Sequence, residues 1–181
     1  MKLMIASDIH GSAYYCARML EQFEKEHAEA LILLGDVLYH GPRNDLPRDY
    51  APKQVIAQLN PLADKILAVR GNCDCEVDQM VLRFPVLADY GVLFLGGRTV
   101  YLTHGHVINK EKPIPFIQGG ILLHGHTHVP ACEDCGGFWY LNPGSVSIPK
   151  SGSAHSYMTW EDGTFHWKDV ETGETWQTQK F

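Results

Sequence analysis

Short apolar runs that end in polar residues recur along the first half of the chain, at residues 2–6, 31–34 and 66–69. Runs of this length without alternation are typical of strands that are buried on both faces. Between them, apolar residues repeat at helical spacing over residues 13–27 and again over residues 52–59. This β-α-β-α-β order predicts parallel strands with helices packed against a face of the sheet.

The second half of the chain has more closely spaced strands. Four are predicted, at residues 92–95, 99–103, 121–123 and 138–141. A hairpin of residues 155–160 and 164–170 follows, around the turn signal Asp162-Gly163. We therefore expect two sheets, the first mostly parallel and the second more antiparallel, in a single domain that spans residues 1–181.

Five polar clusters directly follow predicted strands. They are Asp8-Ile9-His10-Gly11, Gly35-Asp36, Gly71-Asn72-Cys73-Asp74, Thr103-His104-Gly105-His106 and Gly125-His126-Thr127-His128. Because the carboxyl ends of strands in an α/β sheet share one edge, the clusters are expected to converge there. Carboxylate, amide and imidazole donors suit Mn, Fe, Zn, Ni or Co, so the clusters predict a metal site.

Composition narrows the class of protein. With 45% apolar residues the chain can bury a core, and its formal net charge of −6 argues against a dedicated nucleic-acid-binding protein, which would carry a basic face. The five unevenly spaced cysteines do not resemble a disulfide framework. No apolar run is long enough for a signal peptide or a membrane span. We therefore expect a cytoplasmic protein with no membrane partner.

The order of the polar clusters also carries a resemblance. The strings concerned are SDIHG, LGDVLYHGPRN, AVRGNCD, THGH, HGHTH and NPGSVSIPK. The chain resembles the calcineurin-like metallophosphoesterases, and within them the small bacterial and archaeal phosphodiesterases of the YfcE type, over residues 1 to about 150. The resemblance implies a mixed α/β fold, namely a four-layer αββα sandwich of two mixed β-sheets flanked by helices.

A binuclear metal centre is a second implication of the resemblance. The ligands implied for the first ion are Asp8, His10, Asp36 and His128. Those implied for the second ion are the same bridging Asp36 together with Asn72, His104 and His126. Two Mn²⁺ ions are expected, with Ni²⁺, Co²⁺, Fe²⁺, Zn²⁺ or Mg²⁺ as alternatives, because metal availability also governs loading. The implied activity is hydrolysis of the phosphodiester bonds of a small substrate by a hydroxide that the two metals activate.

Four residues are predicted to take part in catalysis: Asp36, Cys73, Asp74 and His106. Most members of the superfamily have histidine at the position of Cys73, where it is thought to protonate the leaving group. Cysteine is also found there in the YfcE-type group, so the identity of the general acid stays open. His106 lies two residues after an implied ligand and is a candidate phosphate contact.

Two alternatives to a phosphodiesterase stay open. A non-catalytic scaffold with this fold, like the retromer subunit of the superfamily, would lack several ligands, and none is missing here. A phosphomonoesterase is poorly separated by sequence, although the closer resemblance favours the diesterase. Loops at about residues 40–50 and 109–118 are expected to recognise the substrate, and relatives suggest a homodimer or homotetramer.

Other polar residues have simpler interpretations. Arg43 and Arg70 could clamp phosphate in a bidentate manner, although Arg70 could equally form a salt bridge with Asp74. His40 and His124 are predicted to be structural or to support the metal ligands.

Overall fold

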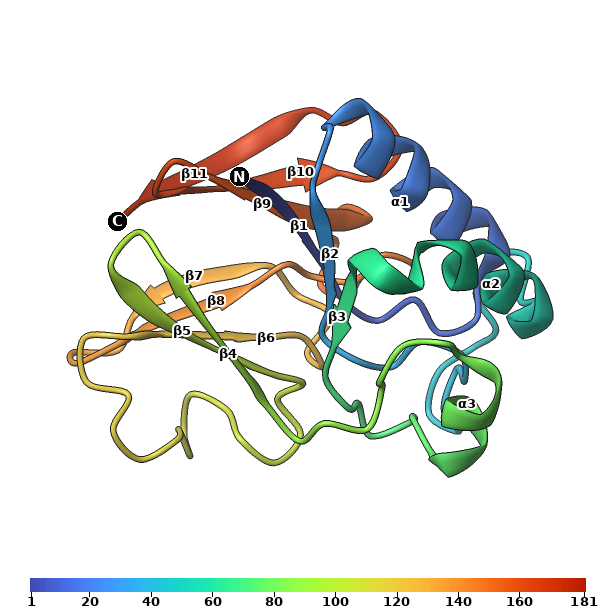
Figure 1. The fold of residues 1–181 in the computed structure, drawn as a ribbon, viewed down its shortest axis with the longest axis horizontal. Coiled ribbons are helices and arrows are strands. Elements are labelled where there is room, and N and C mark those ends of the chain that lie inside the picture. The colour runs from blue at the N-terminus through green and yellow to red at the C-terminus, as the bar shows by residue number, and fades with distance from the viewer.

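The computed structural model describes residues 1–181 and shows two β-sheets packed face to face (Figure 1). The strands of the first sheet are β1 (Lys2–Ala6), β2 (Ala30–Leu33), β3 (Ile66–Ala68), β9 (Ser156–Glu161), β10 (Thr164–Asp169) and β11 (Thr175–Lys180). Those of the second are β4 (Gly91–Leu95), β5 (Arg98–Thr103), β6 (Ile121–His124), β7 (Ala131–Asp134) and β8 (Trp139–Asn142). The helices are α1 (Ala13–Lys25), α2 (Pro52–Leu59), the 3₁₀ helix η1 (Asn60–Lys65) and α3 (Glu76–Val81).

Both sheets are mixed. The first has the order β11-β10-β9-β1-β2-β3, in which β1, β2 and β3 are parallel and the remaining pairs are antiparallel. The second has the order β4-β5-β6-β8-β7, with a parallel centre and antiparallel edges. The expectation of a mostly parallel first sheet and a more antiparallel second sheet is therefore wrong, although two mixed sheets are confirmed.

The reason lies in β9. Residues 156–160 are buried on both faces of the strand, which places β9 inside the sandwich next to β1 and not in the second sheet. Tyr157 packs into the core below the helices, whereas Met158 and Trp160 pack into the core between the sheets. The predicted hairpin of β9 and β10 does form, but it extends the first sheet.

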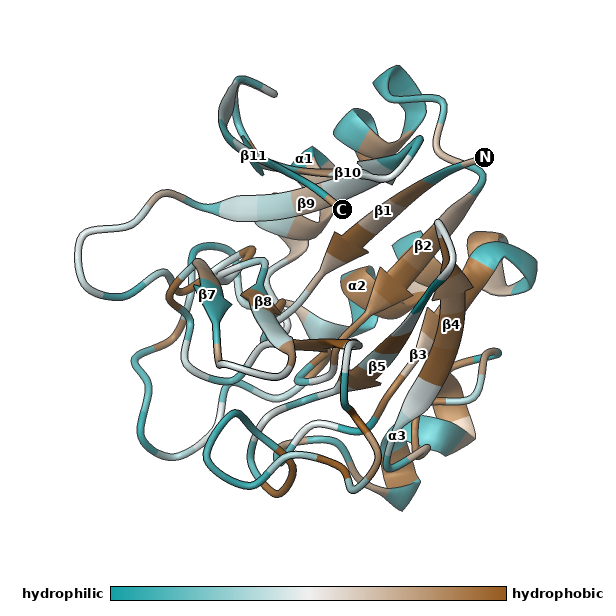
Figure 2. Ribbon diagram, turned by 90° about the vertical axis from the view of Figure 1, so that its left-hand side faces the viewer, coloured by the Kyte–Doolittle hydropathy of each residue, from teal (hydrophilic) through white to brown (hydrophobic).

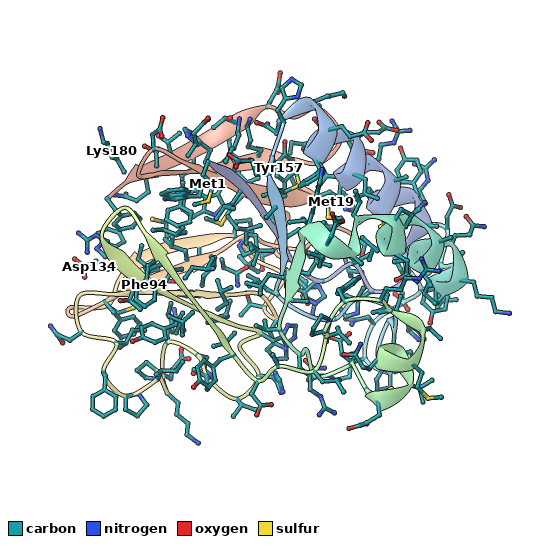
Figure 3. All side chains as sticks on the ribbon, viewed as in Figure 1. Met1, Met19, Phe94, Asp134, Tyr157 and Lys180 are labelled. Carbon is teal, nitrogen blue, oxygen red and sulfur yellow. The ribbon has the colours of Figure 1, made fainter.

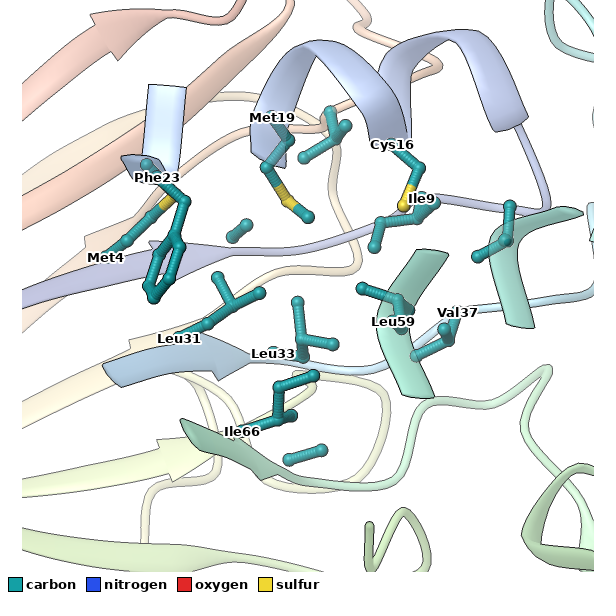
Figure 4. Close-up of a cluster of buried hydrophobic side chains, with 14 of the residues drawn as sticks. Met4, Ile9, Cys16, Met19, Phe23, Leu31, Leu33, Val37, Leu59 and Ile66 are labelled. Atoms are coloured by element: carbon teal, nitrogen blue, oxygen red, sulfur yellow. The ribbon is translucent and has the colours of Figure 1, made fainter. Parts of the chain in front are cut away.

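One core lies between the first sheet and its helices (Figure 4). Ser12 caps the N-terminus of helix α1, because its Oγ accepts a hydrogen bond from the backbone N–H of Tyr15 at 3.2 Å. Its apolar stripe, which includes Met19 and Phe23, packs on Met4 and Leu31 of the sheet. This packing fixes the first sheet, and with it the loops that leave the ends of its strands.

A second core fills the space between the two sheets. Alternate residues of β1 and β2, including Ile5 and Ile32, face Val100, Leu102 and their neighbours across this layer. The two strands accordingly form a hydrophobic band in the centre of the molecule (Figure 2). Since the sheets share this core, the loops at the ends of β1, β2, β5 and β6 are held in fixed relation to one another.

Helices flank only one of the two sheets. All of them precede β4, and α1 and α2 cover the first sheet. The connection between β5 and β6, residues 104–120, is irregular and runs along the side of the second sheet that faces away from the first (Figure 1). Pro113 and Pro115 lie in this connection, and the ring of each proline removes a backbone donor that a helix interior would need. On this side of the second sheet the connection is therefore a loop, and the expected fold of two mixed sheets flanked by helices is confirmed with few helices.

Strand β4, one of the two free edges of the second sheet, is apolar. On β4, Phe94 is 80% exposed (Figure 3). Self-association through the second half of the chain stays a prediction, for which this edge is the available surface. None of the helices is both long enough and apolar enough to cross a membrane.

Candidate metal centre

The loops at the ends of five strands meet beside the core between the sheets. The seven predicted ligands lie in these loops: Asp8, His10, Asp36, Asn72, His104, His126 and His128. Backbone hydrogen bonds join the loops directly, since the N–H of His10 donates to the carbonyl of Asp36 at 2.9 Å. The N–H of His126, from the second sheet, donates to Oδ2 of Asp8 at 3.1 Å. The structure therefore brings all seven residues together.

Four of these side chains form the first half of the site. His10 Nε2 lies 3.2 Å from His128 Nε2 and 3.5 Å from Asp8 Oδ1. His128 Nε2 lies 3.3 Å from the same Asp8 oxygen. Asp36 completes the group, with Oδ2 at 3.6 Å from His10 Nε2.

The second half of the site shares the Asp36 carboxylate. Oδ2 of Asp36 lies 3.4 Å from His104 Nε2, which is 3.1 Å from Asn72 Oδ1 and 3.2 Å from His126 Nδ1. The other oxygen, Oδ1, accepts the backbone N–H of Cys73 at 2.8 Å. One carboxylate oxygen thus faces both halves while its partner is held by the backbone.

Proton positions in the first half can be assigned from the hydrogen bonds of the imidazole rings. Nδ1 of His10 lies 2.8 Å from the carbonyl of Tyr39, and Nδ1 of His128 lies 2.6 Å from the carbonyl of Ile148. A carbonyl only accepts, so each Nδ1 carries the proton and each neutral ring presents an Nε2 lone pair. Those two lone pairs face each other beside Asp8 Oδ1, which is buried and has no hydrogen-bond partner. Such a set of acceptors fits a cation placed among them.

His104 follows the same rule, because its Nδ1 lies 2.7 Å from the carbonyl of Leu34. These carbonyls orient the imidazoles, a support that the sequence pattern did not reveal. Burial alone would raise the pKa of Asp8, but the His10 and His128 rings, when protonated at Nε2, hold it well below its usual value. Burial alone would lower the pKa of His104, yet the Asp36 carboxylate raises it to about 9. Protons and metal ions therefore compete for the same positions.

Five of the seven predicted ligands have left-handed backbone conformations. They are Asp8 (φ 60°), His10 (φ 48°), Asp36 (φ 56°), His126 (φ 66°) and His128 (φ 60°). Each such non-glycine residue costs about 1–2 kcal/mol. Residues held in this region concentrate at functional sites, where the surrounding packing maintains them.

Glycine is required where these loops approach each other most closely. A Cβ on Gly71 would lie 2.1 Å from Asp36 Oδ1, and a Cβ on Gly125 would lie 2.7 Å from Asp8 Oδ2. Any side chain at either position would displace a carboxylate of the site.

Asp74, a predicted catalytic residue, lies behind the site. Its carboxylate accepts backbone N–H groups from Asp36 (2.8 Å), Val37 (2.9 Å) and Gly71 (2.7 Å). Burial raises its pKa to about 6. Of the two alternatives for Arg70, the salt bridge with Asp74 does not form, because Arg70 Nε donates to the backbone carbonyl of Asp74 at 3.2 Å. With both oxygens bound to backbone, Asp74 positions the loop that carries Asp36.

The other two predicted catalytic residues lie on different sides of the centre. Cys73 Sγ is within reach of the ligand atoms of His10 and Asp36. Burial and the Asp36 carboxylate raise the pKa of the Cys73 thiol to about 12. His106 is exposed, with its ring centroid 5.4 Å from that of His104, and it lines two neighbouring cavities. It does not line the cavity over Cys73.

That cavity, of about 390 Å³, opens over both halves of the site. It is lined by Asp36, Gly41, Pro42, Arg43, Asn44, Asn72, Cys73, His126, Thr127, His128 and Lys150. Sequence reasoning singled out Arg43 but missed Lys150, which closes the NPGSVSIPK string. The expected loop at residues 40–50 does form part of the cavity wall, whereas residues 109–118 do not.

His124, by contrast, is a structural residue, as predicted. Its ring is buried and stacks on Tyr140 with the centroids 4.3 Å apart.

The fold and this arrangement of donors define a metallophosphoesterase centre, and the chain belongs to the calcineurin-like phosphoesterase superfamily, whose domain model matches residues 1–162. Membership implies divalent metal ions. Among curated proteins, the chain is similar to the phosphodiesterase YfcE of Escherichia coli K12, with 52% identity over 157 residues that cover 87% of this chain and 85% of YfcE.

Solved structures agree with this assignment. The structure of the E. coli phosphoesterase YfcE superimposes with a TM-score of 0.95, at 45% identity, over 99% of both chains. A Vps29 mutant from Entamoeba histolytica matches with a TM-score of 0.63 at 22% identity, over 100% of this chain and 99% of its own. The likeness to Vps29 concerns the fold alone.

Proposed function

We propose that the protein is a phosphodiesterase that uses two divalent metal ions. The observation that carries the proposal is the position of Asp36 Oδ2, which faces His10 Nε2 in one half of the site and His104 Nε2 in the other. The similarity to YfcE, a named phosphodiesterase, supports cleavage of a diester. The complete set of donors argues against a non-catalytic scaffold.

In this proposal the ligands divide as the geometry groups them. Asp8, His10, His128 and Asp36 would hold the first ion, and Asp36, Asn72, His104 and His126 would hold the second. Hard oxygen and borderline nitrogen donors suit Mn²⁺, with Ni²⁺, Co²⁺, Fe²⁺, Zn²⁺ and Mg²⁺ as alternatives. When bound, such a pair supplies Lewis acidity, which activates water near neutral pH and neutralises charge on the phosphate oxygens.

The side chains around the ions have separate tasks. The carbonyls of Tyr39, Leu34 and Ile148 keep each Nδ1 protonated and each Nε2 free to ligate. The backbone N–H of Cys73 holds Oδ1 of Asp36, so that Oδ2 stays directed at both halves. The Cys73 side chain lies beside the Asp36 carboxylate and lines the cavity, close to where a leaving group would depart.

A hydrolysis screen tests the proposal. The metal-depleted enzyme is loaded separately with Mn²⁺, Mg²⁺, Ni²⁺, Co²⁺ or Zn²⁺ and assayed on paired aryl phosphodiesters and phosphomonoesters. We expect the diester to be cleaved with the higher kcat/KM, and most efficiently with Mn²⁺. Preference for the monoester with every metal would contradict the diesterase assignment, and no activity with any metal would favour a scaffold.

A further inference from the structure

The cavity over the metal ligands contains two cationic side chains that the protein itself leaves without a counterion. Arg43 and Lys150 line it, and neither forms a salt bridge or a side-chain hydrogen bond within the chain. Several other cations do pair with carboxylates, including Lys2 with Glu26 at 2.6 Å and Lys110 with Glu133 at 2.8 Å. The two cavity cations are therefore available to an anion that enters from outside.

Arg43 is carried by a turn that rests on the metal site. The backbone N–H of Asn44 donates to the carbonyl of Gly41 at 3.4 Å, and Asn44 Nδ2 donates to the carbonyl of His40 at 2.8 Å. Gly41 packs against Cys73 so closely that a Cβ there would lie 3.0 Å from Sγ. The turn thus has a fixed place above Cys73 while the guanidinium of Arg43 stays free.

Lys150 is anchored to the other wall of the cavity. Its backbone N–H donates to the carbonyl of His128 at 3.2 Å, and its own carbonyl accepts the hydroxyl of Ser153 at 2.8 Å. Two residues earlier, the carbonyl of Ile148 accepts the Nδ1–H of the same His128. The segment that orients a predicted ligand therefore also places Lys150 in the wall of the cavity.

The two cations exceed what a simple diester needs. Two divalent ions bring four positive charges, of which the carboxylates of Asp8 and Asp36 offset two. A hydroxide nucleophile and a singly charged diester phosphate offset the other two, so the centre is then neutral. Arg43 and Lys150 add two positive charges that a diester with uncharged arms would leave unmatched.

We propose that Arg43 and Lys150 bind a second anionic group, a phosphate or a carboxylate, on one arm of the diester. This inference rests on the proposed diesterase function. Only one of the residues that line the cavity, Cys73, is hydrophobic, which suits a polar arm. The volume of about 390 Å³ leaves room beyond the reacting phosphate for a small substituent. Arginine and lysine are the side chains that most often bind phosphate, arginine by a bidentate contact.

A matched pair of substrates tests the inference. The first is thymidine 5′-(p-nitrophenyl phosphate), and the second is the same diester with an added 3′-phosphate. Both release the same leaving group, so they differ only in the charge of the retained arm. We expect the Mn²⁺-loaded wild type to prefer the second by about tenfold in kcat/KM, mainly through KM, and the preference to shrink at about 0.5 M salt because added ions screen charge.

Substitution locates the effect. Arg43→Gln and Lys150→Gln are each expected to reduce the preference by about threefold, since each removes one charge-assisted contact. Lys53→Gln, which changes an exposed lysine of α2, is the charge-matched control and should keep the preference. Isothermal titration with thymidine 3′,5′-bisphosphate and thymidine 5′-phosphate gives a readout independent of turnover, in which the advantage of the bisphosphate should fall in the same two variants.

Equal kcat/KM for the two diesters, or a preference that survives both substitutions, would overturn the inference and leave the diesterase function intact. Failure of the wild type to cleave either diester with any metal would instead overturn the proposed function. In that case the calorimetric comparison still decides whether Arg43 and Lys150 bind the second anion.

Discussion

Two polar clusters stand at opposite ends of β1. At its start, the carboxylate of Glu26 accepts hydrogen bonds from the ammonium groups of Lys2, at 2.6 Å, and Lys168, and from the hydroxyl of Tyr157 at 3.2 Å. Beyond its end, Asp8 lies among imidazole nitrogens that are themselves acceptors. In the first cluster each acceptor faces a donor, whereas in the second acceptors face one another.

The difference separates a structural cluster from a binding site. With Glu161, which lies 3.5 Å from the Lys2 ammonium group, the Glu26 cluster has as many carboxylates as ammonium groups, and it ties the end of α1 to β1, β9 and β10. The metal centre is incomplete without cations, and its ligands are also held in left-handed conformations. The folded chain thus maintains, at a cost in stability, an arrangement that only bound ions complete. The predictions below test this contrast.

The largest effect is expected at Asp36. Asp36→Asn should lower kcat/KM by about 10³-fold or more, because a neutral amide cannot offset the charge of two ions and loss of even one such electrostatic contact costs 10²–10³. The melting temperature should change little, since the amide oxygen can still accept the N–H of Cys73. Asp64→Asn, an exposed residue of η1, is the control. Activity of Asp36→Asn within a few-fold of wild type at equal metal content would refute the bridging role.

The opposite response is expected at the other end of β1. Glu26→Gln leaves Lys168 without a counterion and Lys2 with only its 3.5 Å contact to Glu161. It should destabilise the protein by about 2 kcal/mol, a fall in melting temperature of about 5 °C. Metal content and kcat should not change. Glu24→Gln, an exposed neighbour on α1, should be neutral in thermal unfolding. Equal melting temperatures for the two variants would show that the Glu26 cluster contributes nothing to the stability of the fold.

The stabilising effect of Glu26 should also depend on pH. Burial alone would raise the pKa of Glu26, but the hydrogen bonds from Lys168 and Lys2 lower it below its usual value of 4.5. A carboxyl with a lowered pKa stabilises the fold above its unfolded-state pKa, and this stabilisation is lost as the pH falls through the folded-state value. The difference in unfolding free energy between wild type and Glu26→Gln should be constant at neutral pH and vanish in acid. A difference that grows in acid would contradict the ion pairing.

A smaller effect is expected at Cys73. Because the pKa of its thiol is raised, Cys73 is a poor proton donor to a leaving group. Cys73→His should therefore reduce the ratio of kcat/KM for aryl over alkyl diesters by about tenfold. This is less than the roughly 10²–10⁴-fold that a well-placed general acid contributes. Cys73→Ser should leave the ratio unchanged. If Cys73→His instead lowers the melting temperature and slows both substrates equally, Cys73 is a packing residue.

Much of the fold could be predicted from the pattern of apolar residues. The bounds of β1 and α2 agree with the expected ranges, because one is a continuous apolar run and the other has helical spacing. β11 and β7 were missed, since both are edge strands with exposed polar residues. The assignment of β9 to the first sheet depends on packing between segments far apart in the chain, which local patterning does not contain.

The candidate ligands could be found from sequence because they directly follow strands. Their backbone support could not, since the carbonyls of Tyr39, Leu34 and Ile148 carry no residue-specific signal. Asp74 looked catalytic by its place in a motif, yet its carboxylate is fully occupied by backbone N–H groups. Lys150 lies 22 positions after His128 in the numbering and reaches the cavity only through the tertiary fold.

The central claim is that the acceptors around Asp36 hold two cations. Anomalous diffraction from crystals soaked in Mn²⁺, recorded at the manganese absorption edge, tests it directly. The account predicts two peaks about 3.5–4 Å apart, each within coordination distance of Asp36 Oδ2. Metal analysis of the soaked protein controls for loading. Absence of any peak near that oxygen, in protein that metal analysis shows to contain Mn²⁺, would contradict the claim.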